Sequence, residues 1–476
     1  MGLHKWETVI GLEIHAQLNT NTKIFSDDRA EFSHSDNKNI SPVSLGFPGT
    51  LPVLNKAVVS MGVKTGLALN CKINTVSVFE RKNYFYPDLA KGYQISQYQH
   101  PLCSHGVVEF YLDGEKRQVK IERAHLEEDA GKSIHQTEGT LINYNRAGVP
   151  LLEIVSAPDM SHPAEAAAYA RAVRQILRYA QVCDGNLEEG SLRCDCNVSI
   201  RPQGQKTLGT KVELKNLNSF RFIEKALEYE VHRQIDLLES GEEVVQETRL
   251  YDSTKNKTFS MRSKEEAEDY RYFPDPDLLP VKLDLEFISE IGRMLPELPS
   301  VKLERFICDY QLSQQDAMFL TEEVDVAQYF EQVASVCHLP KQAANWIMTE
   351  LFRELNNNKL NVTQSHVSAR QLGQLILKIE QGEISGKIAK KAFQLMWERK
   401  QSIDEVIEEQ GWKQVSNDAE IIKWVDEVIS KYPDQVAEFR AGKTKVMGFL
   451  MGQIMKLSKG QANPSVVQNC LQEKLK

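Results

Sequence analysis

The pattern of apolar residues changes near residue 295, and this change constrains the fold more than any other feature of the chain. Before it, short runs of alternating apolar and polar residues end in turns that contain Gly, Pro or Asn, which is typical of β-strands. After it, apolar residues recur every three or four positions, which is typical of amphipathic helices. Strands and helices grouped in this way predict an α+β fold.

The first region, residues 1–294, is predicted to form a domain built on a largely antiparallel β-sheet. Few helices interrupt it. Apolar residues recur at helical spacing over about 161–182, and a second helix is expected to follow Asn218. Pro296 and Pro299 mark the joint with the helical region.

The second region is predicted to form an all-α helical domain over residues 295–408 and a small helical tail domain over residues 409–476. Its expected helices are 302–310, 325–337, 339–356, 366–381 and 387–398. The charge reverses along the tail: residues 401–439 hold ten acids and three lysines, whereas residues 441–476 hold six lysines and one acid. Because the whole chain has a net charge of −9, any polyanion must bind to a local basic surface or through a bound cation.

Several predicted strands place carboxylates or histidine on one face and apolar side chains on the other. Over residues 8–18, Glu13 and His15 alternate with apolar residues, so both belong to the polar face of the strand. Asp195 and Glu213 occupy equivalent positions in two later strands. If these strands adjoin, the polar side chains form one continuous site.

An antiparallel sheet often has one solvated face, on which such acids would serve only solubility. Two features of the set argue against that interpretation. Glu153 lies inside the apolar run 150–155, where an unpaired carboxylate is costly. Glu127, Glu128 and Asp129 are consecutive and repel one another unless a cation compensates. Carboxylates with one imidazole favour Mg²⁺ or Mn²⁺ over metals that prefer thiolates.

Two similar segments combine aromatic and basic residues and end in Pro-Asp. They cover residues 81–88, which include Arg81 and Lys82, and residues 269–275. Such segments either stack a base and clamp a phosphate or pack over the edge of the sheet, and the sequence leaves both possibilities open.

Several strings of residues resemble the B subunits of aspartyl/glutamyl-tRNA amidotransferases. The resemblance runs from about residue 6 to residue 470 without a large gap. The strings that carry it include 9–15, 81–88, 93–97, 125–133, 188–195, 213–219, 269–274 and 460–464. Several of them are long and rarely seen elsewhere, so the resemblance is specific.

The resemblance implies a cradle-shaped N-terminal domain with a kinase-like site, which uses ATP and Mg²⁺. The positions that match the family's Mg²⁺ ligands are Glu13, His15, Glu127, Glu128, Glu153, Asp195 and Glu213. The expected catalytic set is Glu13, His15, Glu128, Asp195 and Glu213. How these ligands divide between one ion and a second stays open.

The resemblance also implies a reaction and its partners. The side-chain carboxylate of Glu-tRNA(Gln), Asp-tRNA(Asn) or both is phosphorylated, and ammonia then displaces the phosphate. The chain has no obvious amidase or glutaminase signature, so the ammonia is expected from glutamine through an amidase A subunit, in a heterotrimer with a small C subunit.

Further residues are expected to assist. Those that offset phosphate charge are Arg81, Lys82 and Lys215, and those that supply hydrogen bonds are Ser191 and Asn216. In the tail, the expected contacts to the tRNA backbone are Lys443, Lys445, Lys456 and Lys459. No apolar run approaches the roughly 18 residues of a membrane span, and we expect a cytoplasmic protein without a membrane partner.

Two other hypotheses remain open on the residues alone. One is a metal-dependent hydrolase in which the carboxylate face activates water, and the other is a non-catalytic tRNA-binding scaffold. The hydrolase does not explain the aromatic-basic segments or the basic tail. The scaffold does not explain a carboxylate at Glu153 within an apolar run.

Overall fold

The chain forms two compact units, Met1–Lys302 and Leu303–Lys476. The computed structural model describes residues 5–263, 270–412, 418–440, 443, 446–458, 462 and 464–475. The first unit contains the β-sheet, and the described elements of the second unit are helices, so the predicted α+β class is confirmed. The further division of the second unit into a helical domain and a tail domain stays a prediction.

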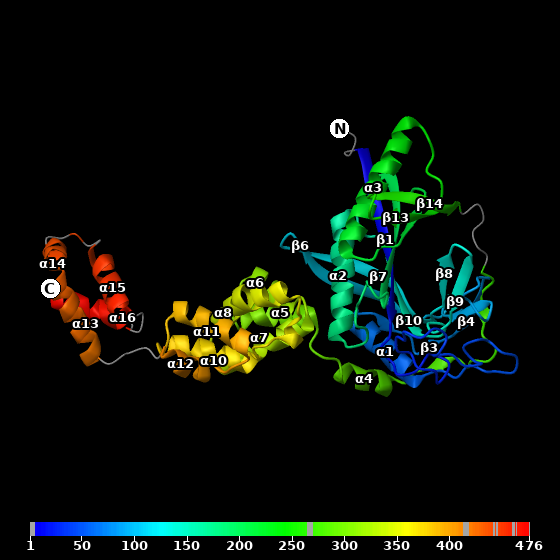
Figure 1. The fold of residues 1–476 in the computed structure, drawn as a ribbon. Helices are drawn as coiled ribbons and strands as arrows, with labels where there is room; N and C mark the ends of the chain where they lie inside the picture. The colour runs from blue at the N-terminus through cyan, green and yellow to red at the C-terminus, as the bar shows by residue number, and fades with distance from the viewer. Residues whose placement is uncertain are drawn as a thin grey trace. The chain divides into compact units, whose positions relative to one another are not determined.

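A nine-stranded sheet forms the centre of the first unit (Figure 1). Its strands, in spatial order, are β14 (Lys257–Ser263), β13 (Glu247–Asp252), β12 (Val212–Lys215), β11 (Leu192–Pro202), β1 (Trp6–Gln17), β10 (Pro150–Ser156), β7 (Glu115–Glu128), β6 (Cys103–Leu112) and β2 (Lys72–Ile73). All neighbours are antiparallel except β12 and β13, which run parallel. The predicted, largely antiparallel sheet is therefore confirmed.

Helices cover the apolar face of this sheet. The helices of the first unit are α1 (Lys56–Ala68), α2 (Pro163–Tyr179), α3 (Phe220–Ser240) and α4 (Leu285–Arg293). The two predicted helices correspond to α2 and α3, which lie side by side along the sheet (Figure 1). Ser219 caps α3 by accepting a hydrogen bond from the backbone of Phe222 at 3.2 Å. Helix α1 was not predicted, because its sequence is rich in Val and Gly, which lower helix propensity.

Three small sheets accompany the main one. Their strands are β15 (Phe273–Pro274), β4 (Glu80–Asn83) and β5 (Tyr93–Ser96) in the first, β16 (Val281–Lys282) and β3 (Val76–Ser77) in the second, and β8 (Lys132–Gln136) and β9 (Gly139–Asn143) in the third. The pairing of β4 with β15 brings the two aromatic-basic segments together, with Arg81 opposite Phe273. Strand β5 contacts the end of β7, where the Ser96 hydroxyl donates to Glu127 at 3.2 Å.

The described elements of the second unit are helices, and the first of them begins just before the boundary at Lys302. Its α-helices are α5 (Pro299–Cys308), α6 (Gln314–Thr321), α7 (Val324–Cys337), α8 (Pro340–Trp346), α9 (Phe352–Asn358), α10 (Ala369–Glu380), α11 (Gly386–Arg399), α12 (Ile403–Gln410), α13 (Asp418–Lys431), α14 (Pro433–Arg440), α15 (Val446–Leu457) and α16 (Pro464–Leu475). The predicted helix over 339–356 is interrupted by a π-helical turn at Ile347–Leu351. The other expected segments match helices to within a few residues.

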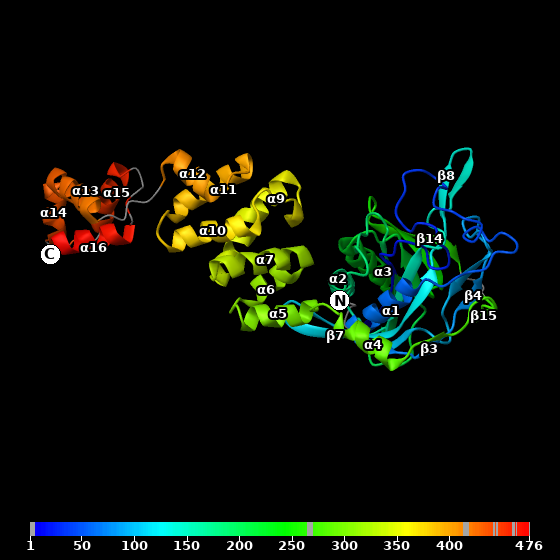
Figure 2. The same cartoon turned by 90° about the horizontal axis from the view of Figure 1, so that it is seen from below.

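The last four helices, α13 to α16, lie together (Figure 2). Their buried apolar side chains form a cluster of their own. Its fully buried members include Ile421, Val425, Leu450 and Leu471. Among the residues that the structure describes, no helix combines the length and the apolar character that crossing a membrane requires.

Candidate functional site

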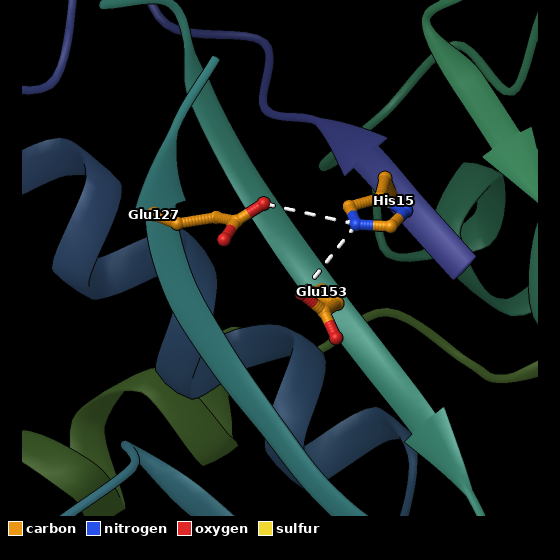
Figure 3. Close-up of side chains that lie close together, drawn as sticks. All are labelled: His15, Glu127 and Glu153. Atoms are coloured by element: carbon orange, nitrogen blue, oxygen red, sulfur yellow. Dashed lines mark ion pairs between the residues drawn. The ribbon is translucent and has the colours of Figure 1, made fainter. Parts of the chain in front are cut away.

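Three neighbouring strands bring His15, Glu127 and Glu153 together on the polar face of the main sheet (Figure 3). His15 on β1 lies opposite Glu153 on β10, and Glu153 lies opposite His125 on β7. Glu127 follows two residues after His125 and therefore has the same orientation, because side chains alternate along a strand. The neighbouring apolar residues, such as Ile14, face the helices instead.

Together with His125, these three residues form a compact cluster, which we call the His15 cluster. Its members are His15, His125, Glu127 and Glu153. The His15 Nε2 atom lies 3.4 Å from Glu153 Oε2 and 3.8 Å from Glu127 Oε1. The His125 Nε2 atom lies at the same two distances from Glu153 Oε2 and Glu127 Oε2. Two ligands bound at about 2.1 Å from one Mg²⁺ lie at most about 4.2 Å apart, so these spacings fit a single divalent ion.

The electrostatics of the His15 cluster favour a positive charge beside its carboxylates. Burial raises the pKa of Glu127 to about 7, and the charge of Glu153 adds to this effect. Burial lowers the pKa of His125 to about 4, which keeps that imidazole neutral at pH 7. Burial also disfavours the charged form of His15, yet Glu153 and Glu127 raise its pKa to about 9. A divalent cation would supply the compensating charge that a proton on His15 otherwise supplies.

A second group of carboxylates adjoins the His15 cluster on the same face. Asp195 on β11 lies opposite Glu13 on β1. The Lys215 ammonium lies 2.7 Å from Asp195 and 3.2 Å from Glu213. The Asn197 amide donates to Glu13 at 2.9 Å. The structure therefore brings the predicted Glu13, Asp195 and Glu213 together, and it holds them with a lysine and an amide.

A pocket of about 410 Å³ opens beside these residues. Its lining combines acids and an imidazole with basic side chains: His15, Glu127, Glu153 and Asp195, together with Lys82, Arg146, Arg193 and Lys215. The predicted Asn216 also lines it. Such a mixture suits a ligand that carries phosphate groups and a metal ion together, since the cations pair with phosphate oxygens that the metal leaves exposed.

Arg146 and Arg193 were not among the predicted site residues. Both bind the carboxylate of Asp129, at 3.2 Å and 2.7 Å respectively. The alternation along β11, which places Arg193 on the same face as Asp195, is a signal that could have revealed Arg193. Arg146 lies in the loop before β10, where no periodicity indicates its direction. His125 was also missed, although it shares a face with Glu127.

The structure separates Glu128 from the His15 cluster. As the neighbour of Glu127 on β7, it faces the opposite way, because consecutive strand residues alternate. Its carboxylate accepts hydrogen bonds from the Lys91 ammonium at 2.5 Å and from the backbone of Ile95 at 2.8 Å. The predicted role of Glu128 as a metal ligand therefore has no support from this geometry.

Arg81 and Ser191 also lie apart from the pocket. The Arg81 guanidinium donates to Asp275 at 2.7 Å and to Asp277 at 3.0 Å, so its charge is already neutralised. Ser191 is buried, and its hydroxyl donates to the carboxylate of Asp184 within the loop before β11. These contacts occupy the guanidinium that we expected to offset phosphate charge and the hydroxyl that we expected to supply a hydrogen bond.

The expected tRNA contacts lie in the second unit. Lys443 is exposed and lies 3.3 Å from Glu438, and Lys456 is exposed in the last turn of α15. Lys445 and Lys459 lie outside the described residues.

Comparison with known families covers both units. A family model described as the GatB/GatE catalytic domain matches residues 8–289, and a second, described as a GatB domain, matches residues 328–475. The chain belongs to the GatB family. Similar GatB proteins are the B subunits of the aspartyl/glutamyl-tRNA(Asn/Gln) amidotransferases of Bdellovibrio bacteriovorus (56% identical, 100% of both chains) and Nitrosococcus oceani (54% identical, 99% of this chain and 100% of the other). The resemblance seen in the sequence is thereby confirmed, and the whole carboxylate face lies within the catalytic-domain match.

Proposed function

We propose that this GatB chain phosphorylates the side-chain carboxylate of Glu-tRNA(Gln), Asp-tRNA(Asn) or both with ATP, and that ammonia then displaces the phosphate to give the amide. Its relatives are named as B subunits of an aspartyl/glutamyl-tRNA(Asn/Gln) amidotransferase, which supports this function. An amidase A subunit supplies the ammonia from glutamine, and a small C subunit completes a cytoplasmic heterotrimer.

The observation that carries the proposal is the His15 cluster beside a pocket with four basic side chains. His15, Glu127 and Glu153 would hold the Mg²⁺, with the group around Asp195 next to it. The bound ion supplies charge neutralisation for the phosphate oxygens. Lys82 and Arg193 line the same pocket and offset the remaining charge of the phosphates.

The chemistry agrees with these roles. A carboxylate is a poor acyl donor because its oxygen is a poor leaving group. In the first step, a carboxylate oxygen forms a bond to the γ-phosphorus of ATP, and the bond from that phosphorus to ADP breaks. In the second, the ammonia nitrogen bonds to the acyl carbon, the carbon–oxygen bond breaks, inorganic phosphate leaves and the nitrogen loses a proton. The nucleophile of the first step is already ionised, so that step requires positioning and charge neutralisation rather than a strong base.

The two other hypotheses predict different sites. A hydrolase needs an ion and a water, and it gives no role to the basic side chains Lys82, Arg146 and Arg193 around the pocket. A scaffold would place the buried carboxylates of Glu127 and Glu153 in one cluster without any use for them, which is costly.

The proposed function is tested by trapping the phosphorylated intermediate. The chain is assembled with its A and C subunits and given misacylated tRNA and ATP labelled at the γ-phosphate, without glutamine. We expect labelled phosphate on the aminoacyl group, and added hydroxylamine should convert that group to a hydroxamate. Release of labelled phosphate without any hydroxamate would indicate a hydrolase, and unchanged ATP would indicate a scaffold.

A further prediction concerns the tail. Deletion of residues 411–476 is expected to weaken tRNA binding about tenfold or more, because it removes the lysines that neutralise backbone phosphates. Glutamine hydrolysis by the assembled complex should change little, since α13 to α16 have their own apolar core. Filter binding and a glutaminase assay on the same preparation measure the two effects. An equal loss of both activities would point to a role of the tail in folding instead.

A further inference from the structure

Four tyrosine rings form a continuous row along the first unit. The ring centroids of Tyr84 and Tyr270 lie 6.1 Å apart, and those of Tyr270 and Tyr272 lie 6.0 Å apart. Tyr272 stacks on Tyr98 with a centroid distance of 4.5 Å and an interplanar angle of 11°. The row exists because β4 and β15 pair, which places residues from the two aromatic-basic segments side by side.

The row connects two hollows of the surface. Tyr84 lines the pocket of about 410 Å³ that contains the His15 cluster. Tyr98, at the other end, lines a second hollow of about 620 Å³. Arg123 also lines the second hollow, and it lies on β7 two residues before His125, on the same face of the sheet. A ligand that follows the row therefore passes from the second hollow to the His15 cluster.

Cations accompany the row at both ends. The Lys82 ammonium lies 4.7 Å from the centroid of the Tyr270 ring, and the Arg123 guanidinium lies 5.7 Å from that of Tyr98. The Nε atom of Arg123 is buried and has no hydrogen-bond partner in the described part of the chain. Arg81 makes a useful comparison, because it also lies over a tyrosine, Tyr93, at 4.2 Å, but two aspartates neutralise it.

We propose that this tyrosine row binds the single-stranded 3′-terminal nucleotides of the aminoacyl-tRNA and leads the aminoacyl end to the His15 cluster. Aromatic rings that stack bases, interleaved with cations that contact phosphates, are the usual recognition elements for single-stranded nucleic acid. ATP has the same chemistry but offers a single base, whereas the row extends from the second hollow to the pocket of the His15 cluster, a span that suits several consecutive nucleotides. The proposal rests on the proposed function and identifies the part of its substrate that this surface binds.

Direct tRNA binding by the assembled complex, without ATP, tests the tyrosine row. Tyr98 is 47% exposed, so it can be replaced with little effect on the core. We expect Tyr98→Ala to raise the Kd for misacylated tRNA about tenfold through the loss of one stacked base, and Tyr98→Phe to bind like the unaltered protein because it keeps the ring. Phe259→Ala, which removes an exposed aromatic ring from the opposite end of the main sheet, is the matched control and should leave the Kd unchanged.

Binding of a shortened tRNA and binding of ATP distinguish the two possible occupants of the row, the 3′-terminal nucleotides and ATP. For a tRNA that lacks its 3′-terminal single-stranded nucleotides, Tyr98→Ala should leave the Kd unchanged, because the base that stacks on the ring is absent. The Kd of ATP should also stay unchanged. A weaker affinity for ATP with an unaltered affinity for tRNA would show that the row binds the nucleotide of ATP and would overturn the proposal. An equal loss for intact and shortened tRNA would overturn it as well.

Arg123, which lies beside Tyr98 at one end of the row, allows an independent measurement. Arg123→Gln should reduce the slope of log K against log salt concentration by about 0.7, the value expected for one lost contact to a single strand. Arg171→Gln, on the exposed side of α2, should leave that slope unchanged. An unchanged slope for Arg123→Gln would show that Arg123 does not contact the phosphates of the bound strand. These measurements use binding alone, so they remain decisive even if no phosphorylated intermediate is found.

Discussion

Replacement of Glu153 by Gln is expected to lower the rate of ATP-dependent phosphorylation about a thousandfold, because the several kcal/mol that a divalent ion contributes to phosphoryl transfer correspond to a factor of this size. Glu153 lies 3.4 Å from both His15 and His125, at the centre of the His15 cluster. A glutamine keeps the size of the side chain but removes the charge that would hold the ion. The affinity for tRNA should stay close to that of the unaltered protein, since the tyrosine row and the tail are untouched.

Two measurements on the Glu153→Gln complex check this expectation. Single-turnover phosphorylation gives the rate, and titration with Mn²⁺ followed by electron paramagnetic resonance gives the number and affinity of bound ions. Glu109→Gln is the control, because Glu109 lies in the same sheet on β6 and pairs with Lys116 on the surface at 3.0 Å. A variant that kept both the bound Mn²⁺ and the rate would exclude the His15 cluster as the catalytic centre.

Replacement of Glu230 by Ala is expected to destabilise the region around α3 by about 3–5 kcal/mol, the usual effect of removing one partner from a buried ion pair. The Glu230 side chain on α3 is fully buried. The Arg233 guanidinium donates to it at 2.6 Å and 2.9 Å, and Gln234 and Thr258 donate at 2.9 Å and 3.0 Å. Arg249 on β13 lies 3.4 Å from it, so the variant leaves a buried guanidinium with less compensation.

Hydrogen exchange of the backbone amides in α3 and β13 measures this loss within the full chain. Glu228→Ala is the matched control, since Glu228 lies on the same helix but is exposed. The network also concerns the site, because Thr248, next to Arg249 on β13, donates to Glu213 at 2.7 Å. Equal protection in the Glu228 and Glu230 variants would show that the network contributes little to stability.

Alternation along single strands predicts much of the polar face. A period of two predicts that Glu13 and His15 share the polar face of β1 and that Asp195 lies on the polar face of β11. Only the structure shows that these two strands are neighbours. The same rule, applied between residues 127 and 128, separates Glu127 from Glu128, although the two acids are consecutive and both match positions of the family's Mg²⁺ ligands. For these two acids, strand alternation indicates that Glu127, and not Glu128, shares the face of His125.

Other parts of the site depend on contacts that no local pattern contains. The tyrosine row requires β4 and β15 to pair, although Arg81 and Phe273 are far apart in the chain. Arg146 reaches the pocket from an irregular loop. The contacts that Asp275 makes with Arg81 depend on the same long-range pairing. Sequence patterns predict which face a side chain occupies, but tertiary folding decides which partner it meets.

The parallel pairing of β12 with β13 has a consequence for synthesis of the chain. Parallel neighbours need a crossover, which here comprises residues 216–246 and contains α3. A nascent chain that has emerged from the ribosome only as far as Lys215 already possesses the strands of the His15 cluster, but β12 is then an open edge. That edge is covered by β13 only after residues up to Asp252 have been synthesised. The strands of the His15 cluster and the partner that covers β12 are thus synthesised at different stages of translation.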